Sequence, residues 1–167
     1  TGLLNKVYAE HTISEWLREK DFEDLQALMM IDMDYFKQIN DTYGHATGDQ
    51  VLKIFAGFLK EQFRATDIIG RVSGDEFMIL MKNVRLDYSI HLHLQKLYTN
   101  LQNIDIPELN DQKLSCSIGC AVAPTDAESF SQLYRLADHA LYTAKHNGRG
   151  RFVIYHDIKN QQETVLS

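Results

Sequence analysis

Residues 71–77 read Arg-Val-Ser-Gly-Asp-Glu-Phe, and this stretch decides how the chain on either side of it folds. Its Ser-Gly pair lies between two apolar runs, residues 68–69 (Ile-Ile) and residues 77–81 (Phe-Met-Ile-Leu-Met). Apolar runs of strand length on both sides of turn-forming residues are typical of a β-hairpin. The sequence therefore predicts a hairpin whose strands cover roughly residues 67–72 and 76–82.

Two adjacent carboxylates, Asp75 and Glu76, follow the turn. Stability alone gives little reason to place both there, because like charges at a tight turn repel each other. A divalent cation would offset the repulsion, since Mg²⁺ prefers oxygen ligands. A second acidic pair, Asp32 and Asp34, follows the apolar residues 25–31. Carboxylates at two strand ends, with lysines and arginines nearby, indicate metal-assisted phosphoryl chemistry; solvated strand-end charges are the plainer alternative.

Length and composition limit the class of protein. At 167 residues, 44% of them hydrophobic, the chain is large enough for one domain with a buried core. Its formal net charge of −6 disfavours broad binding to nucleic acid. We see no apolar run of roughly 20 residues and no signal peptide, so we expect a cytoplasmic domain without membrane contact of its own, alone or within a larger membrane-anchored protein. Cys116 and Cys120 are expected to be buried thiols in a reducing compartment.

Apolar periodicity divides the chain into helices and strands. Helices are predicted at 5–20, 35–39, 49–63, 88–101 and 130–146, and strands at 25–31, 114–122 and 151–155 besides the hairpin. Helices and strands alternate except at the hairpin, which predicts an α+β fold with a mixed, largely antiparallel five-stranded sheet surrounded by helices. The domain would cover residues 1–157, and the polar residues 158–167 would form a tail or the start of a linker. Because the chain opens without methionine, we expect it to be a domain excised from a longer protein.

Five blocks of sequence, in the right order, resemble the GGDEF domain family of diguanylate cyclases. The blocks are residues 1–6, 32–41, 42–49, 73–77 (Ser-Gly-Asp-Glu-Phe) and 141–149. Members of this family condense two GTP molecules into cyclic di-GMP and release two pyrophosphates, on a fold related to nucleotidyl cyclases and polymerase palms. Each domain holds one GTP, so the resemblance implies an antiparallel homodimer in which two domains meet face to face.

The resemblance also implies a role for each matching position. Metal ligation would fall to Asp32, the Met33 carbonyl, Asp75 and Glu76, which would hold two Mg²⁺ or Mn²⁺ ions per active site. The catalytic turn would consist of Ser73, Gly74, Asp75 and Glu76. GTP would be bound by Tyr35, Phe36, Lys37, Asn40, Asp49, Lys145 and Arg149, with Asn40 and Asp49 on the guanine.

Physical chemistry supports several of these roles and leaves plainer ones open. Lys37 lies in the first turn of an expected helix, where free backbone N–H groups favour a phosphate. Asp49 can accept hydrogen bonds from two N–H groups that adenine does not offer, or can be a helix-start carboxylate. Lys145 and Arg149, four residues apart, would share a helix face toward the triphosphate, or would complement the helix dipole. Asp34 precedes a helix, and an N-cap role suits it at least as well as direct chemistry.

Residues 64–67, Arg-Ala-Thr-Asp, resemble the inhibitory site of the family, where dimeric cyclic di-GMP binds and stops the enzyme. The spacing supports the match, because five residues separate this segment from Ser73. Arg64 suits phosphate and guanine edges alike. A helix-end arginine and a turn aspartate, Asp67, are the plainer alternative. Cyclic di-GMP is therefore expected both as the product and as an allosteric ligand.

Ser73 departs from the family, whose members usually carry glycine at this position. Tight hairpin turns often need φ > 0, which penalises residues other than glycine by about 1 kcal/mol or more. Because Gly74, Asp75, Glu76 and Phe77 match the family motif, we expect reduced or normal cyclase activity rather than none. The alternative is a catalytically weak or inactive domain that senses GTP or cyclic di-GMP and regulates an attached sensory or EAL (cyclic di-GMP phosphodiesterase) domain.

Overall fold

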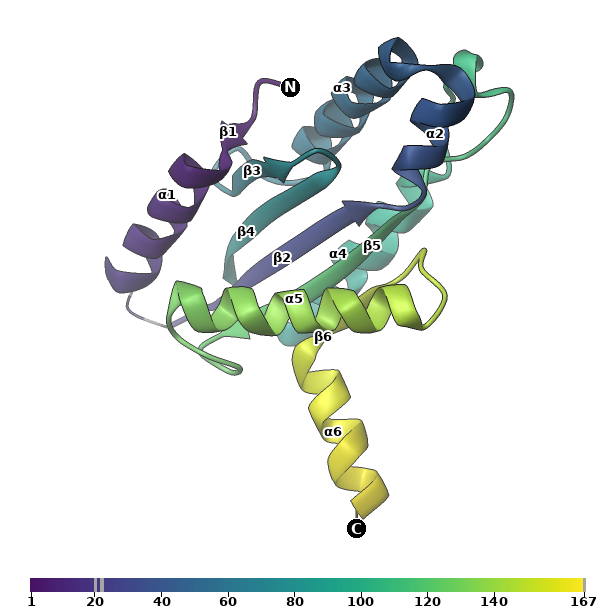
Figure 1. Ribbon diagram of the computed structural model, residues 1–167. Helices are drawn as coiled ribbons and strands as arrows, with labels where there is room; N and C mark the ends of the chain where they lie inside the picture. The colour runs from purple at the N-terminus through teal and green to yellow at the C-terminus, as the bar shows by residue number, and fades with distance from the viewer. Residues whose placement is uncertain (20, 22, 167) are drawn as a thin grey trace.

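A six-stranded sheet lies at the centre of the computed structural model, which describes residues 1–19, 21 and 23–166 (Figure 1). Its strands are β1 (Leu4–Asn5), β2 (Leu25–Met33), β3 (Ile68–Ser73), β4 (Glu76–Val84), β5 (Cys116–Ala123) and β6 (Phe152–Ile154), in the order β1-β3-β4-β2-β5-β6. The two outer pairs are parallel and the three inner pairs are antiparallel. The mixed α/β fold is thus confirmed, with six strands instead of five. The two residues of β1 are too short a run to show an alternating pattern.

Strand β2 is buried on both faces. Alternate side chains of a strand point to opposite faces, and both sets are apolar here: Met29 and Ile31 pack on one side, and Leu28 and Met30 on the other. The predicted buried strand is therefore confirmed and extends to Met33.

Helices cover both faces of the sheet. Helices α1 (Lys6–Glu19) and α5 (Phe130–His146) pack on one face, and α2 (Phe36–Tyr43), α3 (His45–Gln62) and α4 (Asp87–Leu101) pack on the other. In Figure 1, α5 crosses in front of the sheet and α4 lies behind it. Between α4 and β5, the chain forms a 3₁₀ turn (Pro107–Leu109) whose Leu109 is buried.

Two helix boundaries differ from the prediction. Gly44, at φ 88°, separates α2 from α3, so α2 continues to Tyr43 and α3 begins at His45. Glycine adopts such a φ without a steric penalty. Asp49 consequently lies in the second turn of α3, and its interpretation as a helix-start carboxylate is wrong.

Helix α5 approaches the sheet closely at Gly119 of β5. A Cβ at this position would overlap the carbonyl oxygen of Ala137 and the backbone of Leu141. Only glycine permits this distance, because any other residue would push the helix outward. The close contact places the last turn of α5, which carries Lys145, against the end of β2.

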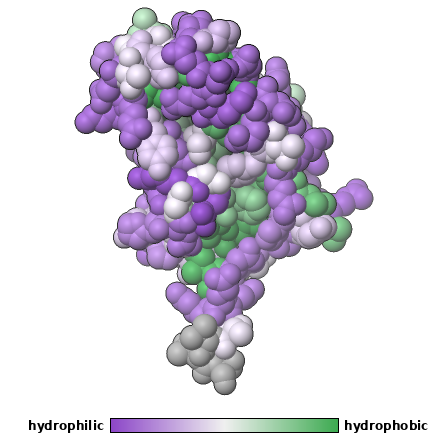
Figure 2. All heavy atoms as spheres, turned by 90° about the vertical axis from the view of Figure 1, so that its right-hand side faces the viewer, coloured by the Kyte–Doolittle hydropathy of each residue, from purple (hydrophilic) through white to green (hydrophobic). Residues whose placement is uncertain are grey.

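The C-terminal residues form a helix, α6 (Tyr155–Leu166), which projects from the body of the protein (Figure 1). The tail expected at 158–167 is therefore helical as far as Leu166, and residue 167 lies outside the described residues. Figure 2 shows α6 extending from a mainly hydrophilic surface, below a hydrophobic area. Beside this helix, a hollow of about 210 Å³ is lined partly by Phe152, Ile154 and Ile158.

Two smaller expectations concern the cysteines and the membrane. Cys116 and Cys120 are both buried and unbridged, as predicted. Among the helices that the structure describes, none is both long and apolar enough to cross a membrane.

Candidate active site

A row of polar residues crosses the sheet at the carboxyl end of β2. Asp32 on β2 is paired with Glu76 on β4 and with Ser117 on β5. Glu76 is paired in turn with Ser73, the last residue of β3. Residues directly opposite each other in antiparallel strands have their side chains on the same face, about 5 Å apart at Cβ. The structure thus brings together two of the carboxylates that the sequence predicts as metal ligands.

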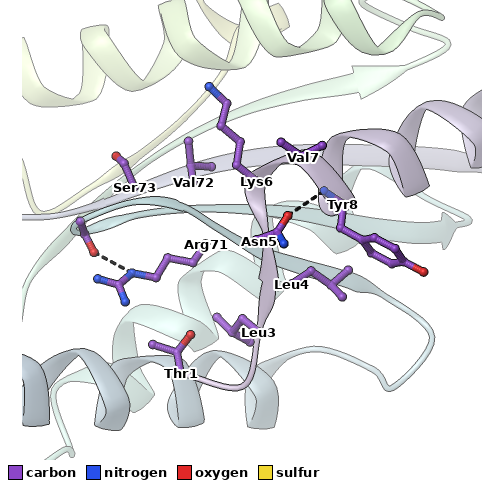
Figure 3. A pocket seen from close by; sticks show the side chains of 11 residues that line it. Thr1, Leu3, Leu4, Asn5, Lys6, Val7, Tyr8, Arg71, Val72 and Ser73 are labelled. Atoms are coloured by element: carbon purple, nitrogen blue, oxygen red, sulfur yellow. Dashed lines mark hydrogen bonds between the residues drawn. The ribbon is translucent and has the colours of Figure 1, made fainter.

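The turn between β3 and β4 is held by backbone contacts as well as by the strand pairing. The Arg71 Nε donates a hydrogen bond to the Gly74 carbonyl (2.9 Å), as Figure 3 shows. The Met33 N–H donates to the Asp75 carbonyl (3.1 Å), which ties the turn to the end of β2. Figure 3 also shows the pocket of about 640 Å³ between this turn and the start of α1. The position of Asp75 is therefore fixed from both sides.

Ser73 carries no backbone strain. Neither Ser73 nor Gly74 is among the residues with positive φ, so the expected penalty for a residue other than glycine is wrong at this position. The β3–β4 register shifts between Arg71 and Ser73, which places Ser73 directly opposite Glu76. The Ser73 hydroxyl donates to the Glu76 Oε2 (2.9 Å).

Lys145 forms an ion pair with Asp32. Its Nζ donates to the Asp32 Oδ2 at 2.6 Å, and the Asp32 side chain is only 13% exposed. Burial raises the pKa of the Asp32 carboxyl, and the Asp75 and Glu76 charges raise it further, whereas the Lys145 hydrogen bond and charge lower it. Three carboxylates and one ammonium thus act on one another at this end of the sheet.

The donor set has the chemistry that a hard divalent cation requires. Asp32, Asp75 and Glu76 supply carboxylate oxygens, and the Met33 carbonyl adjoins them in the chain. In the part of the chain that the structure describes, however, no three or more His, Cys, Asp or Glu side chains are grouped around one point as a metal would need. Lys145 contacts Asp32 instead. The ligands therefore fit Mg²⁺ or Mn²⁺ in kind, and the Lys145 ammonium occupies one oxygen of Asp32, the Oδ2.

Asp34 is a structural residue. Its buried carboxylate accepts hydrogen bonds from the Ser115 hydroxyl (2.5 Å), the Ser117 hydroxyl (2.7 Å) and the Gly150 N–H (2.9 Å). The N-cap interpretation is wrong, because Tyr35 occupies the N-cap position of α2 and no side chain caps this helix end. Asp34 instead ties β2 to β5 and to the loop that follows α5.

That loop brings Arg149 beside Tyr35. Helix α5 ends at His146, so Arg149 lies beyond the helix at φ 62°, and the expectation that it shares a helix face with Lys145 is wrong. Its guanidinium lies 5.5 Å from the centre of the Tyr35 ring, within the range of a cation–π contact. The backbone of Tyr35 adopts the left-handed conformation (φ 58°). Lys37, two residues further along, is exposed in the first turn of α2.

Asn40 and Asp49, the predicted guanine-binding residues, lie near each other at the α2–α3 junction. A Cβ on Gly48 would overlap the Asn40 Oδ1, so the amide packs directly on the backbone next to Asp49. Asp49 is exposed, and Asn40 is half-buried. Asn40 is carried by α2 and Asp49 by α3, and Gly44 alone separates the two helices.

Arg64 and Asp67 form a turn between α3 and β3. The Asp67 carboxylate accepts hydrogen bonds from the Arg64 N–H (2.9 Å) and from the Lys82 N–H (2.9 Å). The Asp67 N–H donates to the Arg64 carbonyl (3.0 Å). A hollow of about 430 Å³ is lined by Arg64 and Asp67 together with Lys60 and the N-terminal residues Gly2 and Leu3. Asp67 is thus a turn aspartate, and the turn faces a hollow.

A family model described as diguanylate cyclase, GGDEF domain, matches residues 1–151. The chain belongs to the GGDEF domain family. The protein named Probable diguanylate cyclase DgcT, from Escherichia coli K12, is 37% identical over 136 residues, which are 80% of this chain and 30% of that protein. The chain spans less than half the length of the first curated relatives that it matches. These similarities support cyclic di-GMP synthesis as the general chemistry of the family.

Solved GGDEF domains have the same fold. The GGDEF domain of TpbB (YfiN) from Pseudomonas aeruginosa is 31% identical, with a TM-score of 0.86 over 97% of this chain and 96% of that one. The GGDEF domain of DgcB from Caulobacter crescentus, solved in complex with cyclic di-GMP, is 25% identical, with a TM-score of 0.83 over 93% of each chain.

Sequence reasoning does not find several residues that shape the site of this GGDEF domain. Arg71, Ser115, Ser117 and the Gly150 N–H all act through partners that are distant in sequence or on the backbone. Only Arg71 carries a sequence signal, since it is a cation two residues before the predicted Ser-Gly turn. The serines on β5 are indistinguishable from ordinary strand residues until β2 is paired beside them.

Proposed function

We propose that this GGDEF domain is an active, metal-dependent diguanylate cyclase that condenses two GTP molecules into cyclic di-GMP and releases two pyrophosphates. The pairing of Asp32 with Glu76, beside the Lys145 ammonium, is the observation that carries the proposal. It gathers negative and positive groups where divalent cations and a triphosphate would meet.

The chain's own residues would bind the triphosphate on two sides. Lys145 would exchange Asp32 for a phosphate oxygen, which conserves its charge pairing. Arg149, held against Tyr35, would contact the outer phosphates. The free N–H groups at the start of α2, at Phe36 and Lys37, add a partial positive charge. Mg²⁺ or Mn²⁺ at the carboxylates would activate the 3′-hydroxyl and stabilise charge on the transferring α-phosphate.

Selection of guanine would follow from Asn40 and Asp49. A carboxylate can accept from guanine N1–H and from its exocyclic amine together, whereas adenine offers no such pair. Their closeness at the α2–α3 junction supports one shared base-binding site. ATP would leave these polar groups unpaired, and the reaction would therefore be selective for GTP.

The reaction would need two copies of the domain. Each copy binds one GTP, so both 3′-hydroxyls reach an α-phosphate only in an antiparallel homodimer. Product inhibition is part of the proposal, with cyclic di-GMP at Arg64 and Asp67 beside the adjoining hollow. The cyclic di-GMP complex of the DgcB domain supports product binding by a related domain.

The deciding experiment measures cyclic di-GMP formation from GTP and Mg²⁺. The chain would be fused to a constitutive coiled-coil dimer, and an Asp75→Ala fusion would serve as the control. Product from the unaltered fusion and none from Asp75→Ala is the expected result.

No product, with GTP still bound, would favour the alternative: a domain that senses GTP or cyclic di-GMP and regulates an attached sensory or EAL domain. The length of the curated relatives is compatible with such attachments, and the activity of the whole protein is proposed on that basis.

A further inference from the structure

Among the three carboxylates of the candidate metal site, Glu76 has the longest side chain, so its backbone position fixes the direction of its carboxylate least. The turn backbone is fixed by Arg71 at Gly74 and by Met33 at Asp75. Asp32 is fixed by Lys145. Glu76, by contrast, is only half-buried and has three side-chain torsions, so its strand position leaves the direction of its carboxylate open.

Ser73 supplies the missing constraint. The register shift between Arg71 and Ser73 turns the Ser73 side chain to the same face as Glu76, and the two residues lie directly opposite each other. The hydroxyl donates to Glu76 Oε2 at 2.9 Å. A glycine at this position would have no group to do so.

We propose that Ser73 is a positioning residue that holds the Glu76 carboxylate in the orientation from which it binds the divalent cation. A carboxylate has two oxygens with about four acceptor sites, so Oε1 stays available to a cation while Oε2 accepts from Ser73. The proposal rests on the proposed function for the identity of the site. The proposal also gives a role to serine at a position where the family usually has glycine, because only the serine has a hydroxyl that can orient the Glu76 carboxylate.

The expected effect follows from the behaviour of groups that orient metal ligands, whose removal typically costs 10- to 100-fold in metal affinity. Because the turn is partly open to solvent, we expect the lower end of that range, about 10-fold, for Ser73→Ala and Ser73→Gly. Ser73→Thr keeps the hydroxyl and should bind within about twofold of the unaltered protein. Rescue by threonine is the result that a purely structural role of the small side chain would not produce.

The test measures Mn²⁺ binding by electron paramagnetic resonance, which separates free from bound Mn²⁺ and requires no turnover. Titrations use the full 167-residue chain, with Mn²⁺ alone and with Mn²⁺ plus a non-hydrolysable GTP analogue. Ser131→Ala, which removes an exposed hydroxyl near the distant start of α5, is the matched control. Thermal unfolding of each variant shows that the fold is retained.

Weaker binding in Ser73→Ala and Ser73→Gly, with normal binding in Ser73→Thr and Ser131→Ala, would support the proposal. Equal or tighter binding in Ser73→Ala would overturn it and leave the cyclase proposal untouched. Absence of Mn²⁺ binding by the unaltered chain, even with the nucleotide analogue, would overturn the metal site itself. Mn²⁺ binding that depends on Ser73, in a protein that forms no cyclic di-GMP, would retain the positioning role and reject the cyclase.

Discussion

At the scale of single residues, Lys145 contacts Asp32 where the proposed reaction needs a metal. An ammonium at 2.6 Å from a mostly buried carboxylate compensates a charge that burial would otherwise disfavour. In the proposed cyclase, a divalent cation at Asp32 would release the ammonium toward the incoming phosphate. Lys145 would then have two partners in turn: the Asp32 carboxylate before a cation binds, and a substrate phosphate afterwards.

Lys145→Ala should therefore lower the rate of cyclic di-GMP formation by about 100-fold or more, comparable to the loss of one preorganised donor to a developing charge. The reason is the loss of a charge-assisted contact to the triphosphate. Initial rates in the coiled-coil fusion measure the effect. Lys159→Ala, on the exposed surface of α6, is the control. A rate for Lys145→Ala within twofold of that control would show that the ion pair is only a helix-end contact.

Asp34 shows why the sequence predicts only part of this site. The sequence predicts that the acidic pair after β2 and the carboxylates of the hairpin are candidate site residues, because strand ends and turns follow from local patterns. The role of Asp34 depends on Ser115 and Ser117, which are more than 80 positions away in sequence and meet it only when β5 pairs with β2. A local rule assigns Asp34 to the helix beside it, and a long-range contact overrides that rule.

At the scale of elements, α5 lies so close to β5 at Gly119 that adding one methyl group tests the importance of their separation. Gly119→Ala would force the backbone at Ala137 and Leu141 away from the sheet, and we expect a loss of about 3 kcal/mol, at the upper end for overpacking. Gly57→Ala is a matched change, since a Cβ in the middle of α3 meets nothing within 4 Å. It should stabilise the protein by about 0.5 to 1 kcal/mol. Urea unfolding of both variants gives the comparison; destabilisation by both would mean that the α5–β5 distance is not the cause.

Helix α6 is fixed at its first turn by a network of acidic and histidine side chains. His156 contacts Asp126 (3.3 Å) from the β5–α5 loop and Asp87 (3.2 Å) from α4, with Asp157 of its own helix at 3.9 Å. His91 on α4 contacts Asp157 at 3.0 Å. The hydrogen bond with Asp126, together with the charges of Asp126 and Asp87, raises the pKa of His156 to about 9, against the opposing effect of burial.

This network predicts how stability depends on pH. The folded-state pKa of His156 lies above the unfolded value of about 6.5, so the stabilisation is complete below about pH 6.5 and is lost as the pH rises through about 9. We expect a loss on the order of 2 kcal/mol across this interval, discounted for a cluster that is partly open to solvent. His156→Gln should flatten the dependence. Urea unfolding at pH 6 and pH 9.5 measures the change in the free energy of unfolding. An equal change in the variant and in the unaltered protein would exclude His156 as the titrating group.

The same helix marks a limit of sequence reasoning for elements. Helix α5 is predicted with its observed ends because an apolar stripe runs to His146 and Asn147-Gly148 follow it. Helix α6 lacks such a stripe, and its first turn is held by partners on α4 and on the β5–α5 loop. Strand β1 is likewise defined by its pairing with Gly70 and Arg71 of β3. Elements with their own periodicity are predictable, and elements that depend on distant partners are not.

At the scale of the whole molecule, strand β3 separates two turns with different proposed roles. The turn of Arg64 and Asp67 precedes the strand, and Ser73 ends it. Six residue steps of extended chain between Asp67 and Ser73 span about 20 Å. A ligand bound at the first turn would therefore have to affect catalysis by a route other than contact with the second turn. In the proposed homodimer, product bound there would hold two copies in an arrangement that keeps their catalytic turns apart.

Arg64→Ala is the substitution that tests this arrangement. Arg64 takes part in the hydrogen bonds of its turn through its backbone N–H and carbonyl, so alanine preserves them. Asp67→Ala, by contrast, would remove the acceptor of two backbone N–H groups and cost stability. We expect Arg64→Ala to leave the initial rate of the coiled-coil fusion unchanged within about twofold. The progress curve of the variant should no longer slow as cyclic di-GMP accumulates, because the variant lacks an arginine that would bind phosphate and guanine. Arg18→Ala, on the exposed end of α1, is the control. Continued slowing in Arg64→Ala, at the same product concentration as in the control, would place the inhibitory ligand elsewhere on the domain.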